Sequence, residues 1–297
     1  MKKASLALLL VLVATSSLQA YFDRLEVGGR ALAMGKAFHA LADDPSAVYW
    51  NPAGFAWQRR AAVLVTHYRP YVVDDLSSNF AALTFPLPGP IGTAGFGWHH
   101  TAISDVMAED LFAFSLARRA DLPVVGDLGL GLTAKFFRVG YDGFRDLETG
   151  EDVDFGSQTK FTADLGAILQ PVEKIRVGVI ARNLGEPVFD FVDGEEQNHG
   201  TPMESELEGS LSFLWNEASV ISLGFAQNRE KELQPTIGSE VLFYDVFALR
   251  SGIFDFEFWG GFGIQTAAWF FDAGFATHKD LGVSYMVSVT VPFGRER

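Results

Sequence analysis

The sequence contains no cysteine and comparatively few basic residues. The absence of cysteine excludes disulfide bonds and thiolate metal sites, and it removes a liability for export through an oxidising compartment. The 23 lysines and arginines stand against 37 aspartates and glutamates, which gives a net charge of −14. Because this acidic balance repels phosphate and no basic patch offsets it, we expect no nucleic-acid partner.

Long apolar runs are also missing. After the first 20 residues, no stretch reaches the roughly 18 consecutive apolar residues that indicate a membrane-spanning helix. Phenylalanine and glycine are abundant instead, with 27 and 30 residues, while only 20% of residues are charged. An exported chain of this composition is either a secreted β-domain or a barrel in lipid, where closure satisfies every backbone group.

Residues 1–20 predict an export signal. Lys2 and Lys3 supply positive charge, residues 4–14 form an apolar run, and a polar, small-residue stretch leads to expected cleavage after Ala20. The apolar run of about 11 residues is too short for a spanning helix, which takes about 20. Cleavage would leave 277 residues, and the loss of two lysines would lower the net charge from −14 to −16.

From Ala61 onward, apolar and polar residues alternate with period two in segments of about ten residues. The last segment is the clearest, because alternate positions from Val283 to Phe293 are all β-branched or aromatic. We count fourteen segments, an even number that suits a bacterial barrel. They are 61–69, 77–86, 91–100, 108–118, 126–139, 157–169, 173–183, 204–214, 217–227, 233–243, 245–254, 257–266, 268–276 and 281–293.

A soluble β-sandwich would alternate as well, but its polar face would be its solvent face. Here the polar face carries many glycines and serines, and the apolar face carries aromatic residues near the segment ends. This favours lipid outside and a crowded lumen inside. The sequence therefore predicts an all-β fold, a transmembrane 14-stranded antiparallel β-barrel over residues 61–297. We expect Trp98, Trp259 and Trp269 to lie at the membrane interface.

The connections support this topology. If the first strand runs outward, the two longest connections, 140–156 and 184–203, both fall on the outer side, and the connections on the other side are short, as in outer-membrane barrels. The acidic loop 140–156 is interpreted as a solvated loop, with cation bridging to the outer leaflet as the alternative. Its acids do not match the spacing of an EF-hand.

Residues 21–60 do not alternate and are rich in small side chains. A barrel of fourteen strands is wider than the eight-strand type that side chains fill, so this segment is predicted to occupy the lumen as a hatch. Within it, residues 37–42 predict a short helix, and Pro45 and Ser46 suit the start of another. Gly28 and Gly29 lack the spacing of a dinucleotide-binding motif, so they indicate close backbone packing.

Three motifs of this segment resemble the N-terminal hatch of the long-chain fatty-acid outer-membrane transporter family, the FadL/TodX type. They are GGRALAMG at 28–35, ALADD at 40–44 and YWNPAG at 49–54. The short chain, RNLG at 182–185 and LRSG at 249–252 look closer to the PorV/PorQ-like branch.

The resemblance implies a 14-strand barrel with the hatch inside and Asn51, Pro52 and Ala53 at the hatch core. In transporter members, hydrophobic molecules pass an outer groove and an internal pocket, and hatch movement opens a path. In PorV-like members the barrel serves protein secretion or surface attachment. The chain departs from the family pattern at Lys36, where glycine is usual. Phe293 is the expected signal for the barrel-assembly machinery, which ordinarily lies nearer the terminus, and here residues 294–297 follow it. The long outer helices of the larger transporters are also missing.

No catalytic motif is present, neither G-x-S-x-G nor H-E-x-x-H. His99 and His100 are consecutive in a strand and point to opposite faces, so they cannot bind one metal together. The sequence therefore predicts no enzyme, no cofactor and no metal site.

Candidate site residues lie in the hatch and on the lumen side of the strands. For the gate or ligand site we expect Phe38, Trp50, Asn51, Pro52, Ala53 and Phe55, although Phe38 and Phe55 fit a simple hatch core equally well. Lumen charges must pair with one another, the hatch or water. They either brace the hatch or hold it in a releasable state. They are Lys135, Lys160, Asp164, Lys174, Arg176, Arg182, Glu206, Glu208, Glu240, Arg250 and Asp272.

Two functions remain open from the sequence. The first is passive uptake of hydrophobic, fatty-acid-like molecules through a hatch-gated lumen in the bacterial outer membrane. The second is a PorV-like role in protein secretion or surface attachment, without small-molecule transport. The expected partners are outer-membrane lipid, the barrel-assembly machinery, and either a hydrophobic small molecule or a secreted protein.

Overall fold

The computed structural model describes residues 25–72, 75–104, 106–145, 152–153, 156–190, 201–216, 218–227, 232–278 and 281–294. The predicted export signal lies outside these residues, as do parts of the two long connections. In the part of the chain that the structure describes, no helix is long and apolar enough to cross a membrane.

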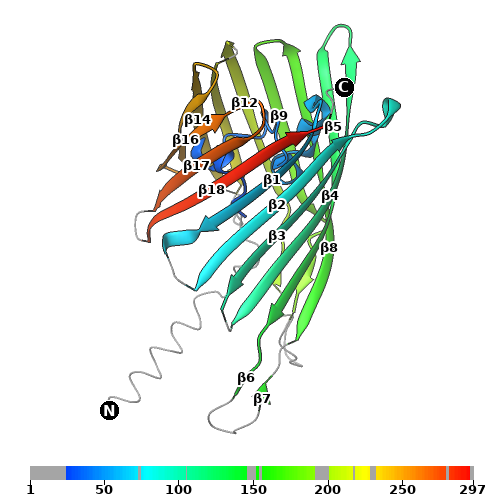
Figure 1. Ribbon diagram of the computed structural model, residues 1–297. Helices are drawn as coiled ribbons and strands as arrows, with labels where there is room; N and C mark the ends of the chain where they lie inside the picture. The colour runs from blue at the N-terminus through cyan, green and yellow to red at the C-terminus, as the bar shows by residue number, and fades with distance from the viewer. Residues whose placement is uncertain are drawn as a thin grey trace.

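Fourteen antiparallel strands close into a barrel, in which each strand pairs with its sequence neighbour and β1 pairs with β18 (Figure 1). The strands are β1 (Ala61–Arg69), β2 (Leu76–Pro86), β3 (Thr93–Ile103), β4 (Met107–Leu122), β5 (Gly126–Tyr141), β8 (Ser157–Val172), β9 (Ile175–Leu184), β12 (Glu206–Asn216), β13 (Ser219–Gln227), β14 (Leu233–Phe243), β15 (Phe247–Phe254), β16 (Glu257–Gln265), β17 (Phe270–His278) and β18 (Gly282–Phe293).

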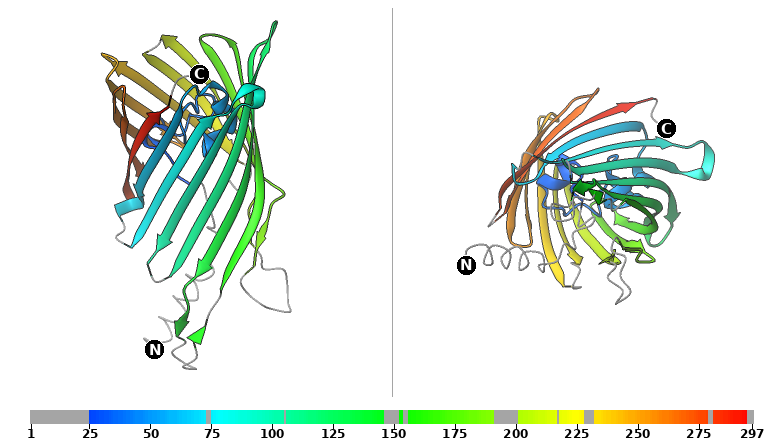
Figure 2. Two further views of the ribbon diagram at one scale, coloured as in Figure 1. Left: turned by 45° about the vertical axis from the view of Figure 1, so that its right-hand side comes forward. Right: turned by 90° about the horizontal axis from the view of Figure 1, so that it is seen from below.

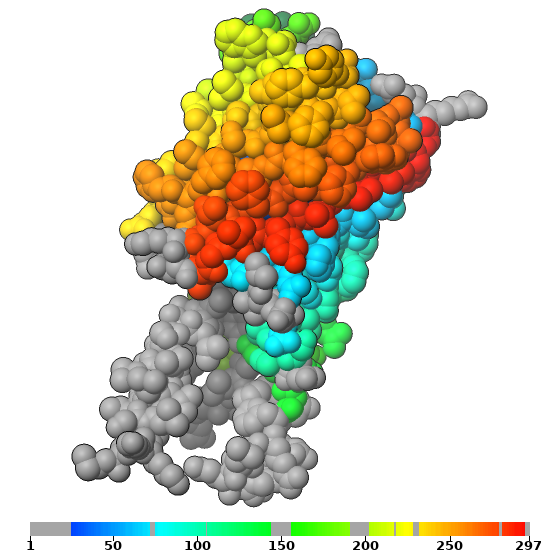
Figure 3. Space-filling model, turned by 60° about the vertical axis from the view of Figure 1, so that its left-hand side comes forward, coloured from blue at the N-terminus to red at the C-terminus, as the bar shows by residue number. Residues whose placement is uncertain are grey.

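The predicted fold and all fourteen segments are confirmed. The segments 61–69 and 233–243 agree with β1 and β14 at both ends, and the largest error is four residues, at the end of β4. The pattern works because one side chain in two faces outward. In β18 the outward Val283 is 47% exposed, whereas the inward Ser284 and Met286 are buried. Figure 3 shows strands from β12 to β18 as oblique bands of side chains across one outer face.

The two ends of the barrel differ. At one end, which we call the turn end, the strands are joined by short connections, including the 3-10 helix η3 (Gly89–Ile91), and β18 ends there. At the other, the loop end, lie η2 (Pro70–Val72) and two short hairpins, β6 (Phe144–Arg145) with β7 (Asp152–Val153) and β10 (Val188–Phe189) with β11 (Thr201–Pro202). Both long connections thus fall on the same end, as predicted.

The hatch lies inside the barrel (Figure 2). It contains α2 (Gly29–Ala33), α3 (Ala47–Trp50) and the 3-10 helix η1 (Pro52–Trp57), and β1 begins at Ala61. The helix expected over 37–42 is wrong, because residues 34–41 form turns and the backbone turns left-handed at Lys36 (φ 63°) and Ala42 (φ 37°). The helix after Pro45 is confirmed as α3, which starts beyond Ser46.

Candidate functional site in the hatch and the lumen

The predicted gate residues form the centre of the hatch. Phe38, Asn51, Ala53 and Phe55 have no exposed surface, and Trp50 is buried as well. The rings of Phe38 and Trp50 meet edge to face at 6.4 Å, and the Trp50 indole N–H donates to the Val27 carbonyl at 2.8 Å. These side chains belong to one apolar cluster that also includes wall residues such as Phe80 and Phe137, so the hatch core is continuous with the barrel wall. The gating role of these residues stays a prediction.

Asn51 joins the hatch to the barrel wall. Its Nδ2 donates to the His39 carbonyl at 2.9 Å and to the Ala167 and Val179 carbonyls of β8 and β9, each at 3.3 Å. Its Oδ1 accepts from the Ala53 N–H at 3.1 Å and so caps η1, where Pro52 takes the first position. One side chain thus satisfies hatch backbone and wall backbone together.

Glycines in the wall allow the hatch backbone to approach this closely. An ideal Cβ on Gly131 would lie 2.4 Å from the Ala53 nitrogen, and one on Gly178 would lie 2.3 Å from the His39 carbonyl oxygen. On the β15 side, a Cβ on Gly252 would lie 2.3 Å from the Gly35 nitrogen. These inward-facing glycines form the seat of the hatch.

A chain of ion pairs joins the hatch to three strands on the opposite side of the lumen. Arg30 of α2 donates from Nε and Nη2 to the two carboxylate oxygens of Glu240, both at 2.8 Å, and from Nη1 to Asp43 at 2.5 Å. Glu240 also accepts from Arg250 Nε at 2.5 Å, and Arg250 Nη1 lies 2.7 Å from Asp272. The predicted lumen charges on β14, β15 and β17 are therefore coupled through one hatch arginine.

Two adjacent hatch acids near the turn end differ in protonation. Burial acts to raise the pKa of Asp43, but Arg30 and Arg176 hold it below its usual range. Burial raises the pKa of Asp44 to about 6, although Arg30 and hydrogen bonds from Ser46 oppose the shift. Asp44 therefore takes up a proton in mildly acidic conditions, while Asp43 stays ionised.

A second set of charges holds the other side of the hatch. Arg182 of β9 donates from Nε to Glu208 of β12 at 2.6 Å and from Nη1 to the Tyr49 carbonyl at 2.5 Å. The same Glu208 Oε2 lies 2.9 Å from His39 Nε2. The Arg182 guanidinium also lies 4.3 Å from the centre of the Tyr49 ring, and burial raises the pKa of the Tyr49 hydroxyl. Barrel and hatch thus share this buried arginine.

The remaining lumen charges do not all contact the hatch. Lys135 pairs with Asp164 at 2.7 Å within the wall. Lys160 lies 6.0 Å from the ring of Phe189 on the β10–β11 hairpin. Arg176 lies 5.3 Å from the Trp57 ring at the turn end.

Glu206 is half-buried and pairs in register with Arg182. The expectation for Lys174 is wrong, because this residue is exposed in the turn between β8 and β9. A lysine at a strand end needs no lumen partner, since water reaches it there.

A cavity of about 240 Å³ lies at the loop end, between the hatch and β1 and β15–β18; we call it the loop-end cavity. Lys36 projects into it, pairs with Glu26, and places its Nζ 4.3 Å from the centre of the Phe254 ring and 4.8 Å from that of Trp259. The cavity is lined by four rings and by polar side chains: Tyr68, Tyr71, Phe254 and Trp259, with Glu26, Asp255, Glu257, Thr277, His278 and Ser284.

The interface role expected for Trp259 is therefore wrong. Trp259 is 5% exposed and faces inward, whereas Trp98 and Trp269 are 37% and 41% exposed. Strict alternation with the outward Phe258 would have placed Trp259 inside. Arg30, Lys36 and His39 were also absent from the predicted site. Their signal in the sequence is a charged or titratable side chain within an otherwise small and apolar stretch.

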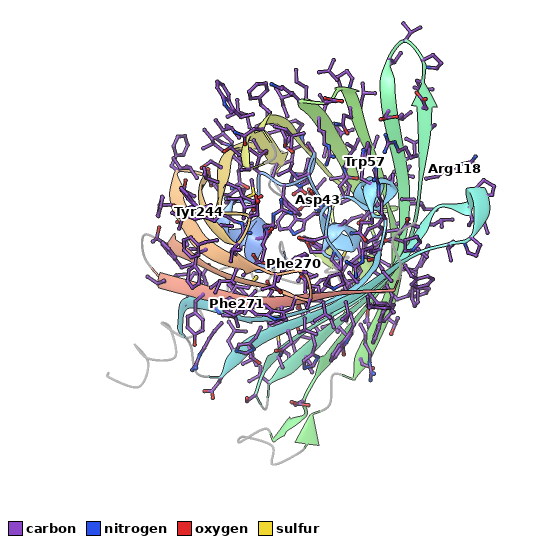
Figure 4. All side chains as sticks on the ribbon, turned by 45° about the horizontal axis from the view of Figure 1, so that its top comes forward. Asp43, Trp57, Arg118, Tyr244, Phe270 and Phe271 are labelled. Carbon is purple, nitrogen blue, oxygen red and sulfur yellow. The ribbon has the colours of Figure 1, made fainter. Side chains whose placement is uncertain are left out.

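The hatch separates this cavity from a second one. A void of about 10 Å³, room for about one water, lies beside the loop-end cavity and shares Lys36 and Phe254 with it. The second cavity, the turn-end cavity of about 340 Å³, is lined by Arg30, Asp43 and Phe270 among others. Figure 4 shows Asp43 within the barrel mouth at this end.

Solved structures of outer-membrane channels share this architecture. The CymD monoaromatic hydrocarbon channel aligns with a TM-score of 0.61 at 12% identity, over 93% of this chain and 100% of that chain. A FadL homologue of Pseudomonas aeruginosa aligns with 0.60 at 11%, over 93% and 100%. The Pseudomonas putida toluene transporter TodX aligns with 0.62 at 10%, over 92% and 100%. The chain has the FadL-type fold.

No protein-family model matches the sequence, and no curated protein matches it either. At identities of 10–12%, the structural likeness carries the fold alone. It confirms the resemblance to the FadL/TodX type at that level. The PorV/PorQ-like branch stays a prediction.

Proposed function

We propose that the protein is a bacterial outer-membrane channel for passive uptake of hydrophobic molecules, including fatty-acid-like ones, and that movement of the hatch opens it. The observation that carries this proposal is a lumen filled by a buried hatch, with a cavity lined by aromatic and charged side chains on one side and an open cavity on the other. The fold supports it, because neighbours of that fold are named as a hydrocarbon channel and a toluene transporter.

The loop-end cavity suits an amphipathic ligand, because the charged side chains of Glu26, Lys36, Asp255 and Glu257 line it beside the four rings. Its rings supply apolar surface, and the Trp259 indole N–H is buried with no acceptor among the described residues. An apolar cavity of about 150 Å³ holds benzene. A cavity of about 240 Å³ thus holds one substituted ring or a folded part of an acyl chain. A longer chain extends further only if Lys36 and Phe254 move.

Hatch movement is compatible with the contacts that hold it. Arg30 and Asp43 lie next to the turn-end cavity, and their side chains are 18% and 35% exposed. Charges released into water recover hydration, which offsets much of the lost attraction. An entirely apolar interface of the same extent would have no such compensation. We therefore propose that the ion pairs hold the hatch in a releasable state.

A reversible disulfide cross-link tests the proposal. Because the chain has no cysteine of its own, two introduced cysteines can pair only with each other. The Ala40 N–H donates to Ser210 Oγ at 2.8 Å, so Ala40→Cys with Ser210→Cys places one thiol on the hatch and one on β12. The double variant is expressed in a bacterial host that lacks its own outer-membrane fatty-acid transporter, and entry of labelled oleate and of toluene is measured. Oxidation should abolish uptake and reduction should restore it.

Each single cysteine variant serves as the control and should keep uptake under both conditions. Uptake that continues after complete cross-linking would exclude hatch movement as the gate. Absence of uptake by the native chain, when the barrel is correctly assembled, would exclude transport of both probes.

A further inference from the structure

The outer wall of the barrel carries an apolar groove of about 550 Å³ over β4, β5, β8 and β9, on the half nearer the turn end. Its origin is visible in two rows of outward-facing neighbours. In one row, Arg118, Leu130 and Ala167 are consecutive ladder partners; in the next, Leu165 lies opposite Ala181. Ala167 and Ala181 are diagonal neighbours on adjacent strands. Their side chains are smaller than those around them, so the two gaps join into one trough.

The floor of this groove is thin. Gly131 and Gly166 form part of it, and their inner side is in contact with the hatch, since an ideal Cβ on Gly166 would lie 2.1 Å from Asn51 Oδ1. One thickness of backbone thus separates the groove from the hatch core. At this place the outer side of the wall carries the alanines Ala167 and Ala181, and its inner side carries the glycines Gly131 and Gly166.

Among the described residues that line the groove, Arg118 alone is charged. It is exposed, and within the described part of the chain it has neither a hydrogen bond nor an ion pair. Its sequence neighbour Arg119 differs in both respects, because it pairs with Asp127 and lies 5.6 Å from the Trp57 ring inside the barrel. Figure 4 shows Trp57 within the barrel and Arg118 at its outer side.

An unpaired arginine on a lipid-facing wall is costly at the bilayer centre and close to neutral near the interface. Arg118 follows the outward apolar residues Phe112, Phe114 and Leu116, and its strand ends at Leu122. This order places Arg118 at the headgroup level, with the groove extending from it toward the bilayer centre. A guanidinium there binds phosphate with two parallel hydrogen bonds.

We infer that this groove is a binding site for one glycerophospholipid of the leaflet at the turn end, with its phosphate on Arg118 and an acyl chain in the trough over Ala167 and Ala181. The apolar lining binds the chain, because burial of each methylene away from water is favourable. The unpaired charge complements the phosphate. The site goes beyond the proposed function, because a bound lipid here does not pass through the lumen.

Native mass spectrometry of the purified full-length barrel tests the site. Delipidated protein in detergent is titrated with phosphatidylglycerol, and in parallel with a diacylglycerol of the same chains, which lacks phosphate. We expect one phosphatidylglycerol to be retained, and diacylglycerol to bind about tenfold more weakly or less, since a charge-assisted hydrogen bond contributes about 1.5–3 kcal/mol.

Two variants address the two halves of the site. Arg118→Gln should reduce phosphatidylglycerol affinity about tenfold, while Arg138→Gln, an outward arginine near the other end of β5, should leave it unchanged. Ala167→Leu with Ala181→Leu fills the trough and should also release the lipid, whereas Ala273→Leu, outward on β17, should not.

The inference is overturned if Arg118→Gln and Arg138→Gln retain phosphatidylglycerol equally, or if diacylglycerol binds as tightly. It is also overturned if the native protein gives dimer ions that the leucine-filled variant lacks, because the groove would then be an interface between copies. Folding of each variant is checked by gel mobility before heating. Uptake of oleate or toluene should be the same in all variants, so failure of this inference is distinguishable from failure of the proposed function.

Discussion

Asn51 Oδ1 occupies the place where a side chain on Gly166 would begin. An ideal Cβ on Gly166 would lie 2.1 Å from that oxygen, and the same asparagine donates to carbonyls on β8 and β9. Because Gly166 has no Cβ, Asn51 can approach the wall closely enough to hold the hatch against it.

The first prediction concerns this contact. Gly166→Ala should displace Asn51 and lower the free energy of unfolding by about 1–3 kcal/mol, the usual cost of overpacking. Gly140→Ala on β5 is the control, because its Cβ would meet nothing closer than 3.5 Å. Thermal unfolding in detergent and limited proteolysis of the hatch measure the effect. Equal midpoints for the two variants would contradict the steric argument.

The second prediction concerns Arg30. Arg30→Met removes the hatch cation that bridges Asp43 and Glu240, and breaking one partner of a buried pair costs up to about 3–5 kcal/mol. Since Glu240 keeps Arg250, we expect the lower part of that range. Hatch proteolysis and channel conductance in planar bilayers should both increase.

Arg30→Lys is the matched control for charge. It keeps the cation but loses the two-pronged contact with Glu240, so its conductance should lie between the native protein and Arg30→Met. If both variants conduct like the native protein, this ion pair does not hold the hatch.

The third prediction concerns pH. The pKa of Asp44 is about 6 in the native hatch, against about 4 in the unfolded chain, so the native state binds an additional proton between these values. Stability contributed by this group should therefore fall as pH rises from about 4 to 6. Asp43, whose pKa is lowered, acts in the opposite direction below about pH 4.

Asp44→Asn keeps an acceptor for the Ser46 N–H and removes the titration. The variant should unfold at a higher temperature than the native protein at pH 7 and at a similar temperature at pH 4.5. The thermal midpoints at these two pH values measure the effect. A constant difference between the proteins at both values would argue against a raised pKa for Asp44.

The fourth prediction concerns the lipid-facing surface. Ala134 faces outward midway along β5, four residues beyond Leu130, the ladder partner of Arg118, so Ala134→Arg should destabilise the barrel in phospholipid vesicles by about 2–4 kcal/mol. Val124 lies in the turn between β4 and β5 and is 96% exposed, so Val124→Arg should change stability by less than about 1 kcal/mol. Urea unfolding in vesicles gives both values. Similar costs at the two positions would place the membrane elsewhere.

The strands were predictable because their signal is local. In each strand, side chains face lipid and lumen in alternation. The resulting period of two residues therefore locates a strand without knowledge of its pairing partners. The same period applied to Trp259 predicts an inward side chain, and at this position it outweighs the preference of tryptophan for the membrane interface. Strand ends were less certain, since residues such as Lys174 meet water whether or not the ladder continues.

The contacts of the hatch had no such signal. Arg30 and Glu240 are 210 residues apart, and nothing near either one in the sequence indicates the other. Asn51 was predicted through a family resemblance, but its bonds to Ala167 and Val179 depend on glycines in strands more than 100 residues away. The helix expected at 37–42 failed for a similar reason: the hatch backbone follows the wall, with left-handed turns that local propensity does not favour.

The distribution of hatch contacts also bears on how the chain assembles. Gly29 donates its N–H to Ser288 on the last strand, and Arg30 pairs with Glu240 of β14, in the final third of the sequence, although the hatch is made first. If β1 and β18 paired before the hatch was in place, the hatch would have to enter the closed barrel through one of its ends. The hatch need not enter a closed barrel if it is in place first and the late strands pair around it. Closure of the barrel between β1 and β18 and enclosure of the hatch would then be one step.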